Sequence, residues 1–230
     1  VVLSEVLKAE SFTDKAGTVL PYRFHVPENY NPEKEYPFIL FLHGAGNRGD
    51  DNLSPISEHM VMMERIMGGE TIVIDGRETR LCDEFIIAIP QCAKGEQWVD
   101  TPWGTMPDPS YSLDEVKQSK YMTAVLEMID DIKSKYNVDD NKMYVTGLSM
   151  GGFGTWDIIM RYPDMFAAAI PMGGGADLSK AEVIKDIPIW TIHQYLDNLV
   201  SSLGTQNMVK ELVKVGGNIK FSGYFEYTHN

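Results

Sequence analysis

A serine between two glycines, in the segment GLSMG at residues 147–151, is the part of the sequence best suited to covalent chemistry. Apolar residues 143–146 precede it, and apolar side chains within residues 153–160 follow at the spacing of a buried helical face. This is the strand, sharp turn and helix of the G-x-S-x-G motif, in which a strained corner exposes a serine hydroxyl. The alternative is a plain glycine-rich connection, but glycine at a helix start costs up to about 1 kcal/mol relative to alanine. We therefore predict that Ser149 is a nucleophile.

A second glycine-rich turn, HGAG at residues 43–46, follows the continuous apolar run at residues 37–42. Such a run is typical of a strand buried on both faces, and the turn leaves backbone N–H groups at its carboxyl end. In serine hydrolases one of these groups forms an oxyanion hole with the N–H of the residue after the nucleophile, here Met150. The turn alone could be structural. Combined with the motif around Ser149, it indicates an oxyanion hole.

A serine hydroxyl needs a base within hydrogen-bonding reach and a third group that orients the base. In hydrolases with the G-x-S-x-G turn, the chain order is serine, acid, histidine. Asp197 follows the buried strand predicted at residues 187–192, and His229 is the histidine beyond it. We expect both to lie at the carboxyl end of the sheet beside the serine. His43 and His193 are flanked by apolar strand residues and are predicted to be structural histidines.

The loop after the strand predicted at residues 85–89 runs for about twenty residues, longer than most connections in a compact domain. It leaves the carboxyl end of a strand, where ligands bind in open α/β sheets, and it carries Trp98 and Trp103. We predict that Trp98 forms a wall of the substrate site. The alternative is that the tryptophans anchor the loop to the body of the domain.

The polar segment NRGDDN at residues 47–52 is predicted to hold the preceding turn through hydrogen bonds from Arg48, Asp50 and Asp51. Its carboxylates raise a metal site as an alternative, but their spacing is not that of a calcium loop. We therefore predict no metal site.

Apolar strands alternate with helices from residue 38 onward. A capping box, SLDE at residues 112–115, predicts the start of a long helix that extends to Tyr136. The other elements are predicted as two antiparallel edge segments within residues 11–26, a helix at 55–67, an Asp-Gly hairpin at 71–77, a strand at 166–172, a helix at 205–215 and a strand at 219–225. The pattern predicts one α/β domain, residues 1–230, with a mainly parallel sheet flanked by helices on both faces.

Composition is that of a globular protein, with 43% hydrophobic and 23% charged residues and no apolar run of membrane-spanning length. A formal net charge of −13 without Lys/Arg clusters argues against nucleic acid or an anionic membrane as a partner. Cys82 and Cys92 bracket a predicted strand that would separate them by roughly 30 Å, so both are predicted to be free thiols. The first ten residues lack a signal-peptide pattern, and the localisation stays open.

Together these motifs resemble the α/β-hydrolase esterases that include feruloyl esterases and polyhydroxybutyrate-depolymerase-like carboxylesterases. The resemblance covers residues 22–230 and rests on LHGAGNRGDDN, the IPQC segment with its tryptophan loop, GLSMGGFGTW and the near-terminal THN. One departure is Gln194, which replaces the glycine that these esterases have after the strand-end histidine. The resemblance implies the α/β-hydrolase fold.

The resemblance also implies roles for individual residues. Ser149 corresponds to the nucleophile, Asp197 to the orienting acid and His229 to the general base. The N–H groups of Ala45 and Met150 correspond to the oxyanion hole.

From these features we expect carboxylic ester hydrolysis through an acyl-enzyme, with no metal or organic cofactor. The expected substrates are small-molecule or polysaccharide-linked esters of feruloyl or short-acyl type. Two alternatives remain: a catalytically silent binding module with the α/β-hydrolase fold, and a serine peptidase of the same fold. Labelling of Ser149 by a fluorophosphonate would separate the enzyme from the silent module, and amide turnover would indicate the peptidase.

Overall fold

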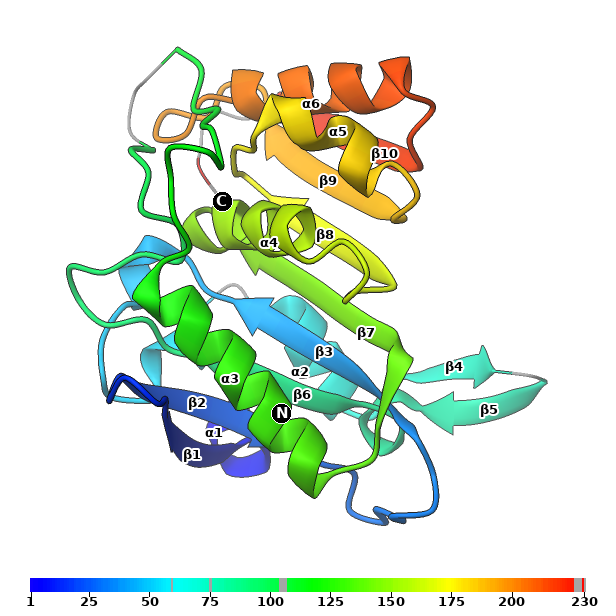
Figure 1. Cartoon of the computed structure of the whole chain (residues 1–230). Coiled ribbons are helices and arrows are strands. Elements are labelled where there is room, and N and C mark those ends of the chain that lie inside the picture. The colour runs from blue at the N-terminus through cyan, green and yellow to red at the C-terminus, as the bar shows by residue number, and fades with distance from the viewer. Residues whose placement is uncertain (59, 75, 104–106, 226–228, 230) are drawn as a thin grey trace.

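The computed structural model describes the chain except residues 59, 75, 104–106, 226–228 and 230. Within the described residues the main sheet has eight strands, in the order β1-β2-β6-β3-β7-β8-β9-β10 (Figure 1). Strands β1, β2 and β6 pair antiparallel, and the neighbours from β6 to β10 pair parallel. The strands are β1 (Lys8–Thr13), β2 (Val19–His25), β3 (Tyr36–Leu42), β6 (Ile86–Pro90), β7 (Val138–Leu148), β8 (Ala168–Met172), β9 (Ile189–Gln194) and β10 (Ile219–Tyr224). The predicted α/β architecture with a mainly parallel sheet is confirmed.

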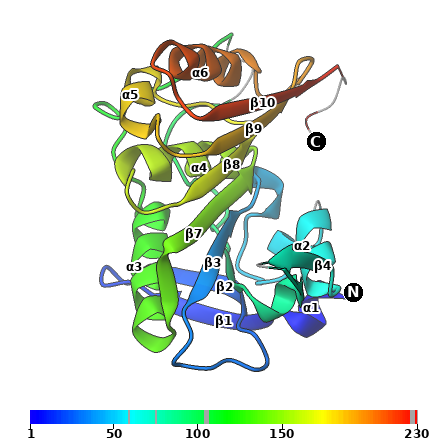
Figure 2. The same ribbon diagram turned by 90° about the vertical axis from the view of Figure 1, so that its right-hand side faces the viewer.

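Helices cover both faces of this sheet, as predicted. Helices α3 to α6 lie on one face, and α1 and α2 lie on the other, over the half of the sheet that contains β2, β6 and β3 (Figure 2). The helices are α1 (Leu3–Val6), α2 (Val61–Met67), α3 (Lys120–Lys135), α4 (Met150–Arg161), α5 (Ala181–Ile184) and α6 (Leu203–Lys214).

The apolar run of β3 is buried on both faces because it contributes to two cores. Phe38, Leu40 and Leu42 belong to the larger core under α3 and α4, whereas Ile39 and Phe41 belong to the smaller core under α1 and α2. Successive side chains of a strand point to opposite faces, so a strand between two helical layers needs apolar residues at every position. The sequence pattern of this strand follows directly from that requirement.

The start of the long helix was predicted wrongly. Helix α3 begins at Lys120, and the Oγ of Ser119 caps it by accepting a hydrogen bond from the N–H of Met122. The predicted capping box at residues 112–115 forms a turn instead, in which the N–H of Leu113 donates to the carboxylate of Asp177. A tertiary contact therefore replaces the local cap at residues 112–115.

The predicted helix at residues 55–67 is shorter than expected. A 3₁₀ turn, η2 (Ser54–Ile56), precedes α2, which begins at Val61. The predicted hairpin is confirmed, since β4 (Thr71–Ile74) and β5 (Arg77–Arg80) pair antiparallel outside the main sheet, although its Asp75 lies outside the described residues.

The two cysteines are free, as predicted, and both are buried. Across the part of the chain that the structure describes, no helix has the length and apolar character needed to cross a membrane.

Candidate active site

The carboxyl end of β7 meets the start of α4 in the turn predicted around Ser149. Two glycines allow this close approach. A Cβ on Gly147 would lie 2.4 Å from the carbonyl O of Gly151, and a Cβ on Gly151 would lie 1.8 Å from the carbonyl O of Leu42. Because real Cβ atoms do not approach backbone atoms this closely, strands β3 and β7 and helix α4 can pack in this way only with glycine at both positions.

Ser149 occupies a backbone conformation that L-amino acids rarely adopt, with φ 57° and ψ −116°. Such a conformation costs about 1–3 kcal/mol and persists only where the surroundings impose it. Here the N–H of Ser149 donates to the carbonyl O of Met172 in the neighbouring strand β8, at 2.8 Å. The turn thus presents the serine hydroxyl at the carboxyl end of the sheet.

Ser149, His229 and Asp197 form a continuous series of hydrogen bonds. The Nε2 of His229 lies 2.5 Å from the Oγ of Ser149, and its Nδ1 lies 2.7 Å from the Oδ2 of Asp197. A carboxylate can only accept, so Nδ1 carries the proton and Nε2 is left to accept the serine hydroxyl. Three side chains that follow different strands of the sheet therefore form one serine–histidine–carboxylate series, the arrangement that the predicted nucleophile, base and acid require.

Asp197 is surrounded by hydrogen-bond donors. Its side chain is 2% exposed, its Oδ1 accepts the N–H groups of Leu199 and Val200, both at 2.8 Å, and its Oδ2 accepts from His229. Burial alone raises the pKa of Asp197, but hydrogen bonds from His193, His229 and the two backbone N–H groups together lower this pKa well below the ordinary value. Asp197 is therefore a carboxylate at neutral pH.

The glycine-rich turn after β3 lies against the serine. A Cβ on Gly44 would lie 3.6 Å from the Cβ of Ser149. Ala45 and Met150 are the first residues of the 3₁₀ turn η1 (Ala45–Asn47) and of α4, where N–H groups have no partner within the helix. Each predicted oxyanion residue thus occupies the first position of a helix, next in the chain to Gly44 or to Ser149.

The chain matches a known protein family over most of its length. Residues 14–213 match the model of the Esterase family, described as "Putative esterase". The chain belongs to the Esterase family. Among curated proteins, this esterase-family chain is similar to poly(3-hydroxyalkanoate) depolymerase C of Paucimonas lemoignei, with 42% identity over 52 residues. It is also similar to the bifunctional acetylxylan esterase/xylanase XynS20E of Neocallimastix patriciarum, with 25% identity over 186 residues.

These curated relatives are much longer than the matched region. The alignments cover 23% and 81% of this chain but 13% and 22% of the depolymerase and of the bifunctional enzyme. Among solved structures, a thermostable esterase matches with a TM-score of 0.78 and 34% identity, over 96% of this chain and 55% of its own. A ferulic acid esterase matches with a TM-score of 0.62 and 19% identity, over 97% of this chain and 91% of its own, which supports the shared α/β-hydrolase fold.

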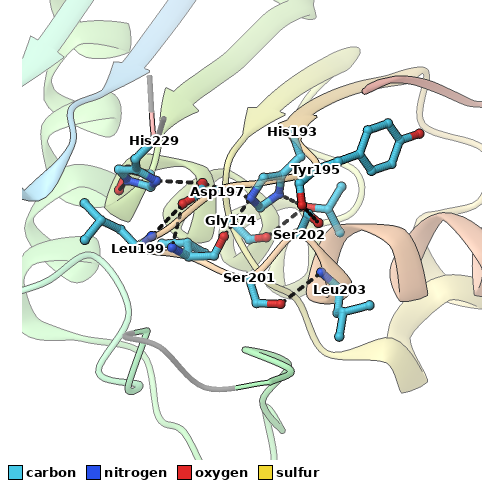
Figure 3. Close-up of polar contacts among 12 residues, drawn as sticks. Gly174, His193, Tyr195, Asp197, Leu199, Ser201, Ser202, Leu203 and His229 are labelled. Atoms are coloured by element: carbon cyan, nitrogen blue, oxygen red, sulfur yellow. Dashed lines mark hydrogen bonds and ion pairs between the residues drawn. The ribbon is translucent and has the colours of Figure 1, made fainter. Parts of the chain in front are cut away.

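His193 takes part in the site, which the sequence analysis missed. It is buried as predicted, but its Nε2 lies 3.2 Å from the Oδ2 of Asp197, the oxygen that also accepts from His229 (Figure 3). A signal was present in the sequence, because His193 shares the core-facing side of β9 with Ile189 and Thr191. A polar ring on a buried face needs hydrogen-bond partners, and Asp197 is one of them.

The prediction that Trp98 forms a wall of the substrate site needs correction. Its side chain is fully buried, and its Nε1–H donates to the carbonyl O of His43 at 3.0 Å. The carbonyl O of Trp98 accepts from the Oγ of Ser119 at the start of α3. Trp98 therefore anchors the loop and supports the turn beside Ser149, which was the alternative given for it.

The ring of His43 forms hydrogen bonds with backbone groups and packs against the ring of Trp98. Its Nδ1–H donates to the carbonyl O of Gly44 at 2.6 Å, and its Nε2 accepts the N–H of Cys92 at 2.9 Å. Burial lowers the pKa of His43 to about 4. The ring is therefore neutral at pH 7 and serves structure, as predicted.

The polar loop after this turn stabilises it largely as predicted. Arg48 donates from Nε to the carbonyl O of Ala45 at 2.9 Å, and Asp51 accepts from the side chain of Gln91 and from the backbone N–H of Leu53. Hydrogen bonds from Ser54, and then from Leu53, lower the pKa of Asp51 well below its ordinary value.

Two open cavities flank Asp197 and His229. One, of about 290 Å³, is lined by apolar side chains of β7, β8 and β9 and by His229. The other, of about 380 Å³, lies between Pro107, Leu199 and Leu203. A larger cavity of about 580 Å³ lies far from Ser149, beside β2 and η3 (Leu81–Asp83), and none of its lining residues belongs to the site. The two smaller cavities, which border Asp197, are therefore better candidates for substrate binding than the larger one.

Proposed function

We propose that this chain is a serine carboxylic-ester hydrolase that acts through an acyl-enzyme, and that residues 1–230 form one catalytic domain. The observation that carries the proposal is the hydrogen-bonded series from Asp197 through His229 to Ser149, at 2.7 Å and 2.5 Å. The strained serine turn adds support, because such strain collects at functional sites.

In this mechanism the Oγ of Ser149 attacks the ester carbonyl carbon while its proton passes to Nε2 of His229. The N–H groups of Ala45 and Met150 hold the carbonyl oxygen as it becomes an oxyanion. The C–O bond to the alcohol then breaks, and the leaving alkoxide takes the proton from His229. Water repeats the sequence on the acyl-serine: its proton goes to His229, its oxygen forms the acid, and the serine oxygen recovers the proton. No metal ion or organic cofactor is required.

We propose small-molecule or polymer-linked esters of aromatic or short acyl groups as substrates. The names of two relatives, an acetylxylan esterase and a poly(3-hydroxyalkanoate) depolymerase, refer to esters of polymers. The apolar cavity beside His229 supports a small acyl or aromatic group, because its lining includes Leu148, Met172 and Ile192.

The test compares wild type with Ser149→Ala on p-nitrophenyl esters of rising chain length and on methyl ferulate. Loss of the nucleophile should lower kcat by about 10⁴-fold or more. Ser134→Ala is the matched control, because Ser134 is an exposed serine at the end of α3 and should leave turnover unchanged. Near-normal turnover by Ser149→Ala would refute the proposal. Absence of fluorophosphonate labelling in folded wild type would instead indicate the silent binding module.

A further inference from the structure

Asp197 lies between two imidazole rings, those of His229 and His193 (Figure 3). The ring of His193 is completely buried. Its Nε2 faces two oxygens, the carbonyl O of Val200 at 3.0 Å and the Oδ2 of Asp197 at 3.2 Å. Neither a carbonyl nor a carboxylate can donate, so this nitrogen must carry a proton and donate to both.

The other ring nitrogen of His193 is held by a buried threonine. Its Nδ1 lies 2.8 Å from the Oγ1 of Thr205, which lies 2.8 Å from the carbonyl O of Gly174. The threonine hydroxyl can donate to Gly174 and accept from Nδ1–H, or it can rotate and donate to Nδ1. In both arrangements the proton on Nε2 stays directed at Asp197.

The two oxygens of Asp197 are held in different ways. Oδ1 is held by two backbone N–H groups of its own loop, those of Leu199 and Val200. Oδ2 is held by His193, from the rigid strand β9, and by His229, which follows the last strand. Without His193, His229 would be the donor left to this oxygen among the residues that the structure describes.

We propose that His193 is a positioning residue for the esterase site: its Nε2–H fixes the Oδ2 of Asp197 where that oxygen accepts the Nδ1–H of His229. This inference rests on the proposed function for its kinetic consequence. His193 acts through Asp197 and does not touch the reacting atoms. His193 lies on β9 and also contacts Thr205 of α6. Asp197 is therefore held by a residue of the core as well as by its own loop.

The test compares His193→Phe, which keeps a ring and removes the donor, with His193→Gln, which keeps an N–H donor. We expect His193→Phe to lower kcat by roughly 10–100-fold, the range found when partners that orient metal-bound histidines are removed. KM should stay within about twofold, since the side chain of His193 is 0% exposed. His193→Gln should recover most of the lost kcat. Unchanged kcat in folded His193→Phe, or equal impairment of both variants, would overturn the inference.

Two controls separate positioning from general damage. Thr205→Val removes the partner of Nδ1 and leaves the contact between His193 and Asp197, so its kcat should fall much less than that of His193→Phe; a loss as large as that of His193→Phe would assign the effect to packing between β9 and α6 and overturn the inference. His25→Phe alters a buried histidine that contacts the carbonyl O of Cys82 far from the site, and it should leave kcat unchanged. If His193→Phe does not fold, His193→Met, with a flexible apolar side chain, replaces it in the comparison.

A structural measurement keeps this inference distinct from the proposed function. A crystal structure of His193→Phe should show Oδ2 of Asp197 displaced and its contact with His229 lost, and an unmoved Asp197 would overturn the inference. If wild type shows no turnover that depends on Ser149, the proposed function fails, and the crystal structure still decides the role of His193.

Discussion

The two sides of the candidate site differ in what holds them. On the serine side, Ser149 sits where β3, β7 and α4 touch backbone to backbone, and a Cβ on Gly151 would lie 1.8 Å from the carbonyl O of Leu42. On the acid–base side, Asp197 accepts side-chain hydrogen bonds from His229 at 2.7 Å and from His193 at 3.2 Å, and the first of these joins residues 32 positions apart. Steric exclusion fixes the first side, and polar pairing fixes the second.

This difference has consequences for mutation. Where backbone atoms are in direct contact, the structure has no room for an added methyl group, so one such group on the serine side should lower the stability of the whole domain. Hydrogen bonds can be exchanged for others of similar geometry, so the acid–base side should tolerate a replacement that keeps the donor. Substitutions on the two sides should therefore differ in their effects on stability.

Gly151→Ala should have the largest effect. Its new methyl group would overlap the carbonyl O of Leu42, so we expect the free energy of unfolding to fall by more than about 4 kcal/mol, or the protein not to fold. Urea unfolding followed by circular dichroism measures this. Gly46→Ala is the matched control, because a Cβ there has nothing within 4 Å, and it should change stability by less than about 0.5 kcal/mol. Similar stabilities of the two variants would refute the steric account of the serine side.

Acid should destabilise the protein through His43. Because burial lowers the pKa of His43 from 6.5 to about 4, the unfolded chain binds its proton first as the pH falls. The stability contributed by the neutral, buried ring of His43 is fully present above pH 6.5 and is lost as the pH falls from 6.5 to 4. We expect the free energy of unfolding to fall by about 3 kcal/mol over this range. Urea unfolding at several pH values should show a shallower loss for His43→Gln. Burial also lowers the pKa of His25, which contributes in the same direction in both proteins. Parallel pH dependences of wild type and variant would contradict the prediction.

Trp98→Phe should lower the free energy of unfolding by about 1–3 kcal/mol, because it leaves the buried carbonyl O of His43 without its indole donor. The ring stays in place, so the loss reports mainly the hydrogen bond. Thermal unfolding measures it, and Trp103→Phe, in a partly buried position of the same loop, is the comparison variant. A stability equal to wild type would show that Trp98 anchors the loop through packing alone.

Ser149→Gly should have the smallest effect, and of opposite sign. Glycine adopts a φ of 57° without steric cost, whereas Ser149→Ala keeps the strained Cβ. We therefore expect the free energy of unfolding of Ser149→Gly to exceed that of Ser149→Ala by about 1 kcal/mol. Differential scanning calorimetry of the two inactive variants measures this gain. A lower melting temperature for Ser149→Gly would mean that the turn stores no strain at this residue.

Features formed by contiguous residues were predicted from the sequence more accurately than features that depend on contacts between distant segments. The turn around Ser149 was predicted because strand, glycines and helix are contiguous, and the run of β3 was predicted because burial on both faces leaves a continuous apolar pattern. The start of α3 was missed, because residues 112–115 match the capping-box pattern but are held by a tertiary contact with Asp177, whereas the segment that starts at the observed cap, Ser119, lacks that pattern. Trp98 was predicted with two alternatives, and burial decided between them.

The sequence alone predicted the order of the elements, the position of the strained serine, and an acid and a histidine that follow it at strand ends. Only the tertiary structure decided that Asp197 Oδ2 is shared by His229 and His193, and that Trp98 faces the core. The physical reason is that strand order and helix faces are encoded by short periodic patterns. The partner of a buried polar group depends instead on which distant segments fold against it.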